Sequence, residues 1–305
     1  MDLFELRNEN ELIHIRENSF KLEKEMQTLT ESNLQNIFNL SLIKSEFSLN
    51  NFRIDTLAFD NEADAFVVIE YKKDKNFSVI DQGYAYLSLM LNNKADFILE
   101  YNETQDKNLK KSDVDWSQSR VLFISPSFTR YQMESINFKD LPIELWEIKK
   151  FGNNIISFSQ VTTASSQESV KTISRDDDTT KKVKKEIKVY TEEEHIKGSS
   201  DTSVELYEKL KNSILDFENV SIKPKKKYIA FVGATNIVDV LIQKDVIKLW
   251  LNLKKGHLDD PKKIARDVSN VGHWGNGDYE IRVLNDDNFE YILSLIKQSY
   301  LKNKK

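Results

Sequence analysis

The run AFVVIEYK, at residues 65–72, constrains the fold more than any other stretch of the chain. Its first five residues are apolar without alternation, which is typical of a strand covered on both faces. RIDTLAFD, at residues 53–60, precedes it as a second strand, and SVIDQGYAYLSLMLNN, at residues 78–93, follows it with the period of a helix. This order predicts an α/β domain in which a sheet lies between helices.

The remainder of the first 160 residues continues this pattern. Alternating apolar residues, helical spacing and turn residues predict further elements. They are a hairpin at 3–17, a helix at 19–38 with Ser19 as its N-cap, strands at 42–48 and 120–126, a second helix at 94–102, a short helix at 130–136 and a hairpin at 143–161. Residues 1–160 therefore form the first predicted domain.

Residues 161–201 lack large apolar side chains at regular spacing and carry the blocks DDD, KKVKK and EEE in succession. Such a segment buries too little surface to offset its ordering entropy, so we predict a charged flexible linker. Residues 202–305 then predict a smaller α+β domain. Its expected elements are a helix at 203–217, strands at 227–234, 236–244, 246–254 and 279–285, a short helix at 260–268, and a closing helix at 286–301 capped by Asp286 or Asp287.

Composition excludes several classes of protein. The formal net charge of −5 gives the 305-residue chain no global basic field, so any polyanion site must be a local patch. The absence of cysteine excludes disulfides and thiolate zinc sites, and the four histidines lack metal-ligand spacing. No apolar run approaches the roughly 20 residues of a membrane span, and the start MDLFELRNEN does not resemble a signal peptide. We therefore expect a cytoplasmic protein.

Three charged residues interrupt the two central strands. Asp55 lies inside RIDTLAFD, Glu70 ends AFVVIE, and Lys72 follows after one residue. Side chains two residues apart share a face of a strand, so Glu70 and Lys72 point the same way, and a hairpin would bring Asp55 beside them. Two close carboxylates repel each other, and Mg²⁺ prefers one or two carboxylates together with water and phosphate oxygens. Asp55 and Glu70 could hold such an ion, with Lys72 orienting water. Alternatively, the two acids could form a structural ion pair with Lys72 or Arg53.

With the helix that follows, this arrangement resembles the PD-(D/E)XK nuclease superfamily in its RecB-like and NucS-like branches. RID is followed by EYK, and QGYAY is similar to the Gln-x-x-x-Tyr motif of the RecB-like branch. KEMQTLTESNLQNIF resembles the entry helix of NucS-like nucleases. The resemblance is strongest over residues 19–100 and departs from the family pattern at Ile54, where the family name has proline. It implies a restriction-endonuclease-like mixed sheet flanked by helices, and a Mg²⁺- or Mn²⁺-dependent endonuclease that hydrolyses phosphodiester bonds in DNA or, alternatively, RNA.

The resemblance also implies roles for individual residues. Asp55 and Glu70 would hold the metal, Lys72 would activate or orient water, and Gln82 would hold Lys72 or the substrate backbone. Glu25 falls at the glutamate of the entry helix, where it would lie around the metal or position water. The residues expected to contact nucleic acid are Arg53, Lys73, Tyr86, Lys225 and Lys226. The last two belong to the run KPKKKY, which could instead be a solvated sheet edge.

A catalytically inactive nucleic-acid- or protein-binding module on a nuclease scaffold is the alternative function. The resemblance suggests restriction, repair or defence against foreign DNA in a bacterial cell, and it allows a homodimer. The second domain resembles a domain of unknown function that often follows such nucleases, which implies no chemistry. Its loop GHWGNGD, at 272–278, is not preceded by the strand that a dinucleotide-binding site requires. Trp274 in this loop either folds onto the core or stacks on a base.

Overall fold

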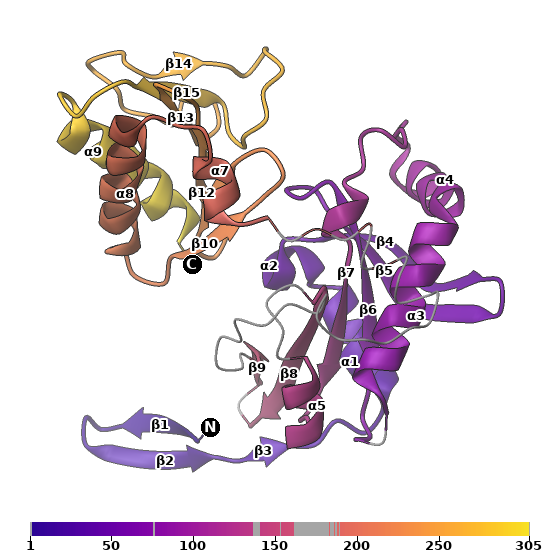
Figure 1. Cartoon of the computed structure of the whole chain (residues 1–305). Helices are drawn as coiled ribbons and strands as arrows, with labels where there is room; N and C mark the ends of the chain where they lie inside the picture. The colour runs from indigo at the N-terminus through magenta and orange to yellow at the C-terminus, as the bar shows by residue number, and fades with distance from the viewer. Residues whose placement is uncertain are drawn as a thin grey trace. The chain divides into compact units, whose positions relative to one another are not determined.

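The computed structural model divides into two compact units, Met1–Lys188 and Val189–Lys305 (Figure 1). Each unit has its own sheet and its own hydrophobic core. The structure describes residues 2–75, 77–136, 141–152, 154–161, 183, 186, 188 and 190–304. Most of the predicted linker at 161–201 lies outside the described residues.

The first unit contains a seven-stranded mixed sheet with the strand order β3-β8-β7-β6-β5-β4 and with β9 paired to β8. The strand β7 runs parallel to both β6 and β8, and the remaining pairs are antiparallel. The strands are β3 (Glu17–Asn18), β4 (Ser41–Leu49), β5 (Phe52–Asp60), β6 (Ala65–Tyr71), β7 (Arg120–Ser125), β8 (Ile143–Phe151) and β9 (Ile155–Gln160). This confirms the predicted mixed sheet.

Helices cover both faces of this sheet (Figure 1). They are α1 (Glu23–Glu31), α2 (Leu34–Phe38), α3 (Val79–Asn92), α4 (Lys94–Gln105) and α5 (Arg130–Ser135). All of β6 is buried, and its side chains alternate between two hydrophobic clusters. Phe66 belongs to the cluster that contains Leu87 of α3, whereas Val67 belongs to the cluster that contains Met26 of α1. The apolar run at residues 65–69 is therefore explained as predicted from the sequence, because both faces of β6 are covered.

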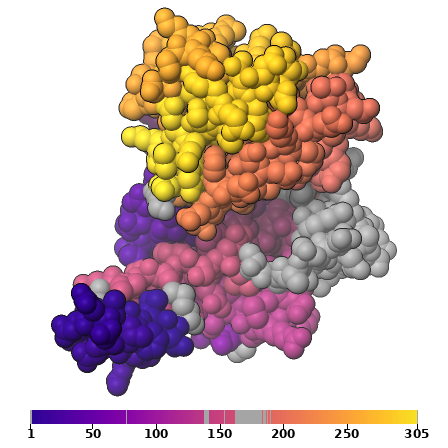
Figure 2. Space-filling model, turned by 90° about the vertical axis from the view of Figure 1, so that its left-hand side faces the viewer, coloured from indigo at the N-terminus to yellow at the C-terminus, as the bar shows by residue number. Residues whose placement is uncertain are grey.

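The N-terminal strands β1 (Leu3–Arg7) and β2 (Glu11–Ile15) form the predicted hairpin, a separate two-stranded sheet. It projects from the rest of the first unit and is the indigo part of the surface in Figure 2. The prediction that Ser19 caps the next helix is wrong, because α1 begins at Glu23 with Leu22 at the N-cap. The pairing of β3 with β8 keeps the chain extended through Asn18, so the helix begins later.

The second unit contains a six-stranded antiparallel sheet with the order β10-β11-β12-β13-β15-β14. Its strands are β10 (Ser221–Pro224), β11 (Ile229–Val232), β12 (Asn236–Ile242), β13 (Ile247–Leu251), β14 (Arg266–Asp267) and β15 (Tyr279–Val283), and its helices are α7 (Glu192–Ile196), α8 (Asp201–Leu215) and α9 (Phe289–Asn303). Side chains of α8 and α9 form one core with the sheet, which confirms the α+β class. No helix in the described residues is long and apolar enough to cross a membrane.

Two local predictions for the second unit are wrong. Residues 260–268 form turns and the short strand β14 rather than a helix. The side chain of Asp260 accepts a hydrogen bond from the Ala265 amide at 2.8 Å, and β14 pairs with β15, so tertiary hydrogen bonds replace those of a helix. The helix α9 has Asn288 at its N-cap, without a side-chain hydrogen bond. Asp286 instead pairs with Lys209 of α8 at 3.1 Å.

We expect Gly277→Ala to destabilise the second unit, because Gly277 has a φ of 88° and its added Cβ would lie 1.8 Å from the Leu251 carbonyl oxygen. The loss in unfolding free energy should exceed about 2 kcal/mol in urea denaturation. Gly256→Ala is the matched control, since Gly256 has a φ of 84° and open space around its Cβ position. Equal losses in the two variants would contradict a role for the close approach to Leu251.

Candidate active site

The strands β5 and β6 stop pairing beside the two predicted acids. Their last recorded pair at this end is Thr56 with Ile69, so Asp55 stands opposite Glu70 one step further along. The Tyr71 amide donates to Asp55 Oδ2 at 3.0 Å, where a main-chain acceptor would otherwise be expected. The Lys72 amide donates to the Ile124 carbonyl of β7 at 2.9 Å. The end of β6 is therefore held by β7 on one side and by the Asp55 side chain on the other.

Glu70 is the most heavily bonded acid of the site, with only 4% of its surface exposed. Its Oε1 accepts from Lys72 Nζ at 2.7 Å and from Gln82 Nε2 at 3.0 Å, and its Oε2 accepts from the Tyr86 hydroxyl at 2.8 Å. Gln82 and Tyr86 lie one turn apart on α3 and also contact each other at 3.3 Å. The helical spacing of QGYAY therefore aims two donors at one carboxylate.

The surroundings of the site raise the pKa of both Asp55 and Lys72, for different reasons. Burial, followed by the negative charge of Glu70, raises the pKa of Asp55 to about 6. Burial opposes the charge of Lys72, but the hydrogen bond and the charge of Glu70 outweigh it and raise the pKa of Lys72. Two carboxylates and one ammonium thus leave the site with an excess of negative charge, which is what a cation site requires.

Gln27 of α1 supports this site from the opposite face of the sheet and was missed in the sequence. Only 3% of its surface is exposed, and its amide donates to the main-chain oxygen of Asp55 at 2.7 Å and to Glu31 Oε1 at 3.0 Å. Thr56 also donates to Glu31 Oε1, at 2.6 Å. The sequence did contain one indication, because Gln27 follows Met26 beside the apolar stripe of the helix. A buried polar side chain at such a position needs hydrogen-bond partners.

Glu46 of β4 is a second residue that sequence patterns did not indicate. It has a φ of 56° and lies between the recorded pairs Ser45–Thr56 and Phe47–Ile54, so it faces Asp55 across the ladder. Hydrogen bonds first from Arg53 and then from Lys24 lower the pKa of Glu46 to about 2. The guanidinium of Arg53, expected to contact phosphate, is therefore engaged by Glu46 in this structure.

Two other predicted residues of the first unit, Glu25 and Lys73, make their contacts outside this centre. Glu25 pairs with Lys150 of β8 at 2.8 Å, a contact that lowers the pKa of Glu25. Lys73 is exposed, and its ammonium donates to the Lys21 carbonyl at 2.9 Å. None of the contacts recorded for the described residues connects Glu25 to Asp55 or Glu70. Lys225 and Lys226 belong to the second unit, in the turn between β10 and β11.

The donor set fits a hard divalent cation that relies on few protein ligands. Within the described residues no group of three or more His, Asp or Glu side chains converges, so the site offers two carboxylates. Mg²⁺ commonly takes one or two carboxylates and completes its shell with water and substrate oxygens. The three donors to Glu70 use three of its roughly four acceptor positions, which leaves one for an ion.

Comparison with known proteins identifies the family. A protein of Haemophilus influenzae, described as uncharacterized, is 50% identical over 290 residues, which cover 95% of this chain and 96% of the relative. The chain belongs to the same family as this Haemophilus protein. Residues 192–303 match a family described as a domain of unknown function, DUF5655, in agreement with the expectation for the second domain.

Solved structures similar to part of the chain are those of a repair endonuclease and of EndoMS. The crystal structure of a repair endonuclease from Pyrococcus abyssi matches 43% of this chain and 50% of its own, with 20% identity and a TM-score of 0.25. EndoMS matches 48% of this chain and 64% of its own with 18% identity, at TM-scores of 0.29 in a complex titled with dsDNA and 0.28 in apo form. The matched region is thus less than two thirds of each of these proteins.

We expect Asp55→Asn to stabilise the metal-free protein in a pH-dependent manner. The pKa of Asp55 in the folded state is raised from 3.8 to about 6, so between these two pH values the native state binds more protons than the unfolded state. The wild type therefore loses stability as the pH rises through this window. The advantage of Asp55→Asn should therefore grow across the window and then level off, at about 2 kcal/mol after allowance for solvent screening.

Urea denaturation in EDTA at several pH values on both sides of this window measures the effect. Asp74→Asn is the control, because it removes an exposed carboxylate near the same end of β6. A pH-independent difference between Asp55→Asn and wild type, or the same pH profile in the control, would contradict the assignment.

Proposed function

We propose that the unit Met1–Lys188 is a Mg²⁺- or Mn²⁺-dependent nuclease that hydrolyses phosphodiester bonds in DNA. The observation that carries this proposal is the convergence of Asp55, Glu70 and Lys72 where β5 and β6 separate. The strand alternation places Asp55 on the face of Leu57, whose cluster includes α3. The same face carries Glu70, which bonds Gln82 and Tyr86 of α3.

Asp55 and Glu70 are the residues that would hold the metal. The raised pKa of Asp55 reports that burial and the charge of Glu70 disfavour its ionised form, and a divalent cation between the two acids would remove this penalty. When bound, such an ion supplies Lewis-acid polarisation of the phosphoryl oxygen and lowers the pKa of a coordinated water.

Lys72 acts in this proposal as a fixed positive charge. Its raised pKa keeps the amine protonated at neutral pH, so it orients water and offsets negative charge on the phosphate rather than accepting a proton. In the hydrolysis the oxygen of water bonds to phosphorus, the ester P–O bond breaks, and the leaving oxygen acquires a proton. The 2.7 Å contact with Glu70 holds the ammonium on the side of the acids.

The surrounding residues take positioning or binding roles. Gln82 and Tyr86 fix the orientation of Glu70 through their hydrogen bonds. Glu25 would exchange its partner Lys150 for a water near the metal. The cations proposed to contact the DNA backbone are Arg53 and Lys73 in this unit and Lys225 and Lys226 in the second.

We expect the full chain to degrade plasmid or single-stranded DNA in Mg²⁺ or Mn²⁺ and to lose this activity in EDTA. Asp55→Ala and Lys72→Ala should each lower the rate at least about 100-fold, since each removes charge from the reacting centre. Lys111→Ala removes an exposed lysine of the same unit and serves as the control. Equal activity in wild type and Asp55→Ala would reject the proposal and indicate a contaminating nuclease. RNA is tested in parallel.

We also expect Mn²⁺ to stabilise the folded wild type without substrate. At one hundred times its dissociation constant, a ligand that binds only the native state adds about 2.7 kcal/mol to the unfolding free energy. The shift should disappear in Asp55→Asn, which lacks one of the two carboxylates. Thermal denaturation with and without Mn²⁺ measures it, and an equal shift in both proteins would place the ion elsewhere.

A further inference from the structure

The loop at 271–277 of the second unit is hydrogen-bonded to a buried acid of the sheet, Asp239. Asp239 of β12 has no exposed surface and lies on the face of the sheet opposite to α8 and α9, because its neighbours Val238 and Val240 belong to the core with those helices. Its Oδ2 accepts hydrogen bonds from the main-chain amide and the side chain of Asn276. Asn236 donates to its Oδ1 at 2.7 Å.

Close packing on Trp250 fixes the same loop. The ring of His273 stacks on Trp250 with centroids 6.3 Å apart, and its two nitrogens contact the carbonyls of Val271 and Gly277 at 2.7 and 2.8 Å. A Cβ at Gly275 would lie 2.6 Å from the Trp250 ring. Gly275 and Gly277 are therefore required by close approach within the domain rather than by a dinucleotide, whereas Gly272 has open space around its Cβ position.

This anchoring leaves Trp274 on the surface, with 57% of its area exposed. The expectation that Trp274 could fold onto the core is wrong, because Trp250 and His273 already occupy that position. Lys227 Nζ lies over the Trp274 ring, 4.9 Å from its centroid, a cation–π contact that occupies one face of the ring. A large aromatic side chain exposed on a rigid loop is a preformed stacking surface rather than part of the core.

The turn between β10 and β11 holds the lysines beside this ring. The Lys225 amide donates to the Tyr228 carbonyl at 2.8 Å, which closes the turn, and the Tyr228 hydroxyl contacts Asn276 Nδ2 at 3.1 Å. The carbonyl of Lys225 also contacts His195 of α7 at 2.7 Å. The basic turn and the aromatic loop are thus joined into one surface, defined by Trp274 and Lys225–Lys227.

We propose that this surface binds single-stranded nucleic acid. An indole face stacks on an unpaired base of any sequence, and a neighbouring ammonium group such as that of Lys227 donates hydrogen bonds to the phosphate beside that base. Duplex bases are already stacked on one another and cannot offer a face to Trp274. Trp274 and Lys227 take no part in the proposed hydrolysis, so their contribution to binding can be measured without cleavage.

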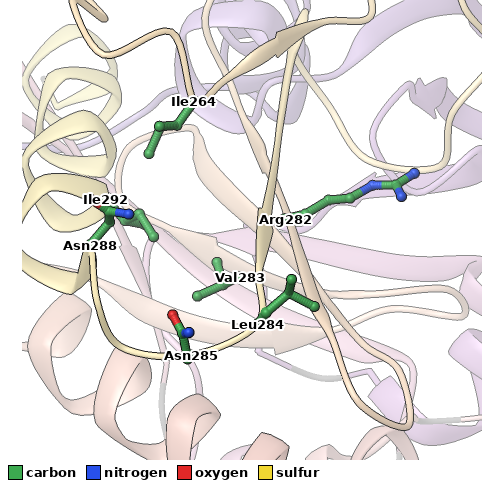
Figure 3. A pocket seen from close by; sticks show the side chains of 7 residues that line it. All are labelled: Ile264, Arg282, Val283, Leu284, Asn285, Asn288 and Ile292. Atoms are coloured by element: carbon green, nitrogen blue, oxygen red, sulfur yellow. The ribbon is translucent and has the colours of Figure 1, made fainter.

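A pocket elsewhere in the second unit lacks these features. It has a volume of about 200 Å³ and lies beside β15 and the start of α9 (Figure 3). Its one charged lining residue, Arg282, points away from the other lining side chains and pairs with Glu280 at 3.2 Å. The pocket therefore offers neither a stacking face nor a cation directed into it.

Fluorescence anisotropy of a labelled oligothymidine with the full chain in EDTA tests the proposal without cleavage. Trp274→Ala should raise the dissociation constant about tenfold, whereas Trp274→Phe, which keeps an aromatic face, should retain most of the affinity. Lys227→Ala should flatten the slope of log Kd against log salt by about 0.7. Tyr131→Ala is the control, because Tyr131 is an aromatic residue of the first unit with 85% exposure.

Circular dichroism and thermal denaturation confirm that each variant is folded. An unchanged dissociation constant in Trp274→Ala, or equal losses in Trp274→Ala and Trp274→Phe, would overturn the proposal. An equal loss of duplex affinity in Trp274→Ala, or no binding of oligothymidine at low salt, would overturn it as well. Cleavage is measured separately through Lys72→Ala in Mg²⁺. Absence of metal-dependent cleavage by the wild type, or equal cleavage by Lys72→Ala, with Trp274-dependent binding preserved would reject only the hydrolytic function. Cleavage that depends on Lys72 without Trp274-dependent binding would reject only this surface.

Discussion

The mutual repulsion of the Asp55 and Glu70 carboxylates, where the pairing of β5 with β6 ends, is the constraint around which the first unit is organised. Asp55 and Glu70 face each other at the end of an apolar ladder, where desolvation strengthens their interaction and raises the pKa of Asp55 to about 6. Lys72 offsets part of this charge from the same face. A fold that served only its own stability would gain by replacing such a cluster with apolar side chains, so its presence is the strongest argument for a site.

Rigid support from both sides of the sheet keeps the two acids in place. Helix α3 contributes the amide of Gln82 and the hydroxyl of Tyr86 to Glu70, and helix α1 contributes the amide of Gln27 to the main chain of Asp55. Both helices are held by separate hydrophobic clusters, one on each face. The left-handed backbone of Glu46 opposite Asp55 is a further local distortion at this point, of a kind that concentrates at functional sites. The fold itself therefore fixes the geometry of the two acids.

The second unit uses its buried polar group differently. Asp239 is fully enclosed and bonded by Asn236 and Asn276, so it organises a loop rather than facing a ligand. The result is an exposed aromatic ring next to a basic turn. The first unit thus contains a compact charged centre and the second an exposed aromatic ring beside lysines, and each is built within its own unit.

Local pattern alone determined most of the elements, and it determined which side chains within one element share a face. A period of two residues places Glu70 and Lys72 on one face, and a period of 3.6 places Gln82 and Tyr86 one turn apart, because these relations need only the backbone of a single element. Only the tertiary structure decided that Gln27 lies beneath Asp55, that Glu46 engages Arg53, that residues 260–268 form a strand edge instead of a helix, and that Trp274 is exposed. These outcomes depend on hydrogen bonds and packing between segments far apart in the chain, and such contacts leave no periodic signal in the sequence.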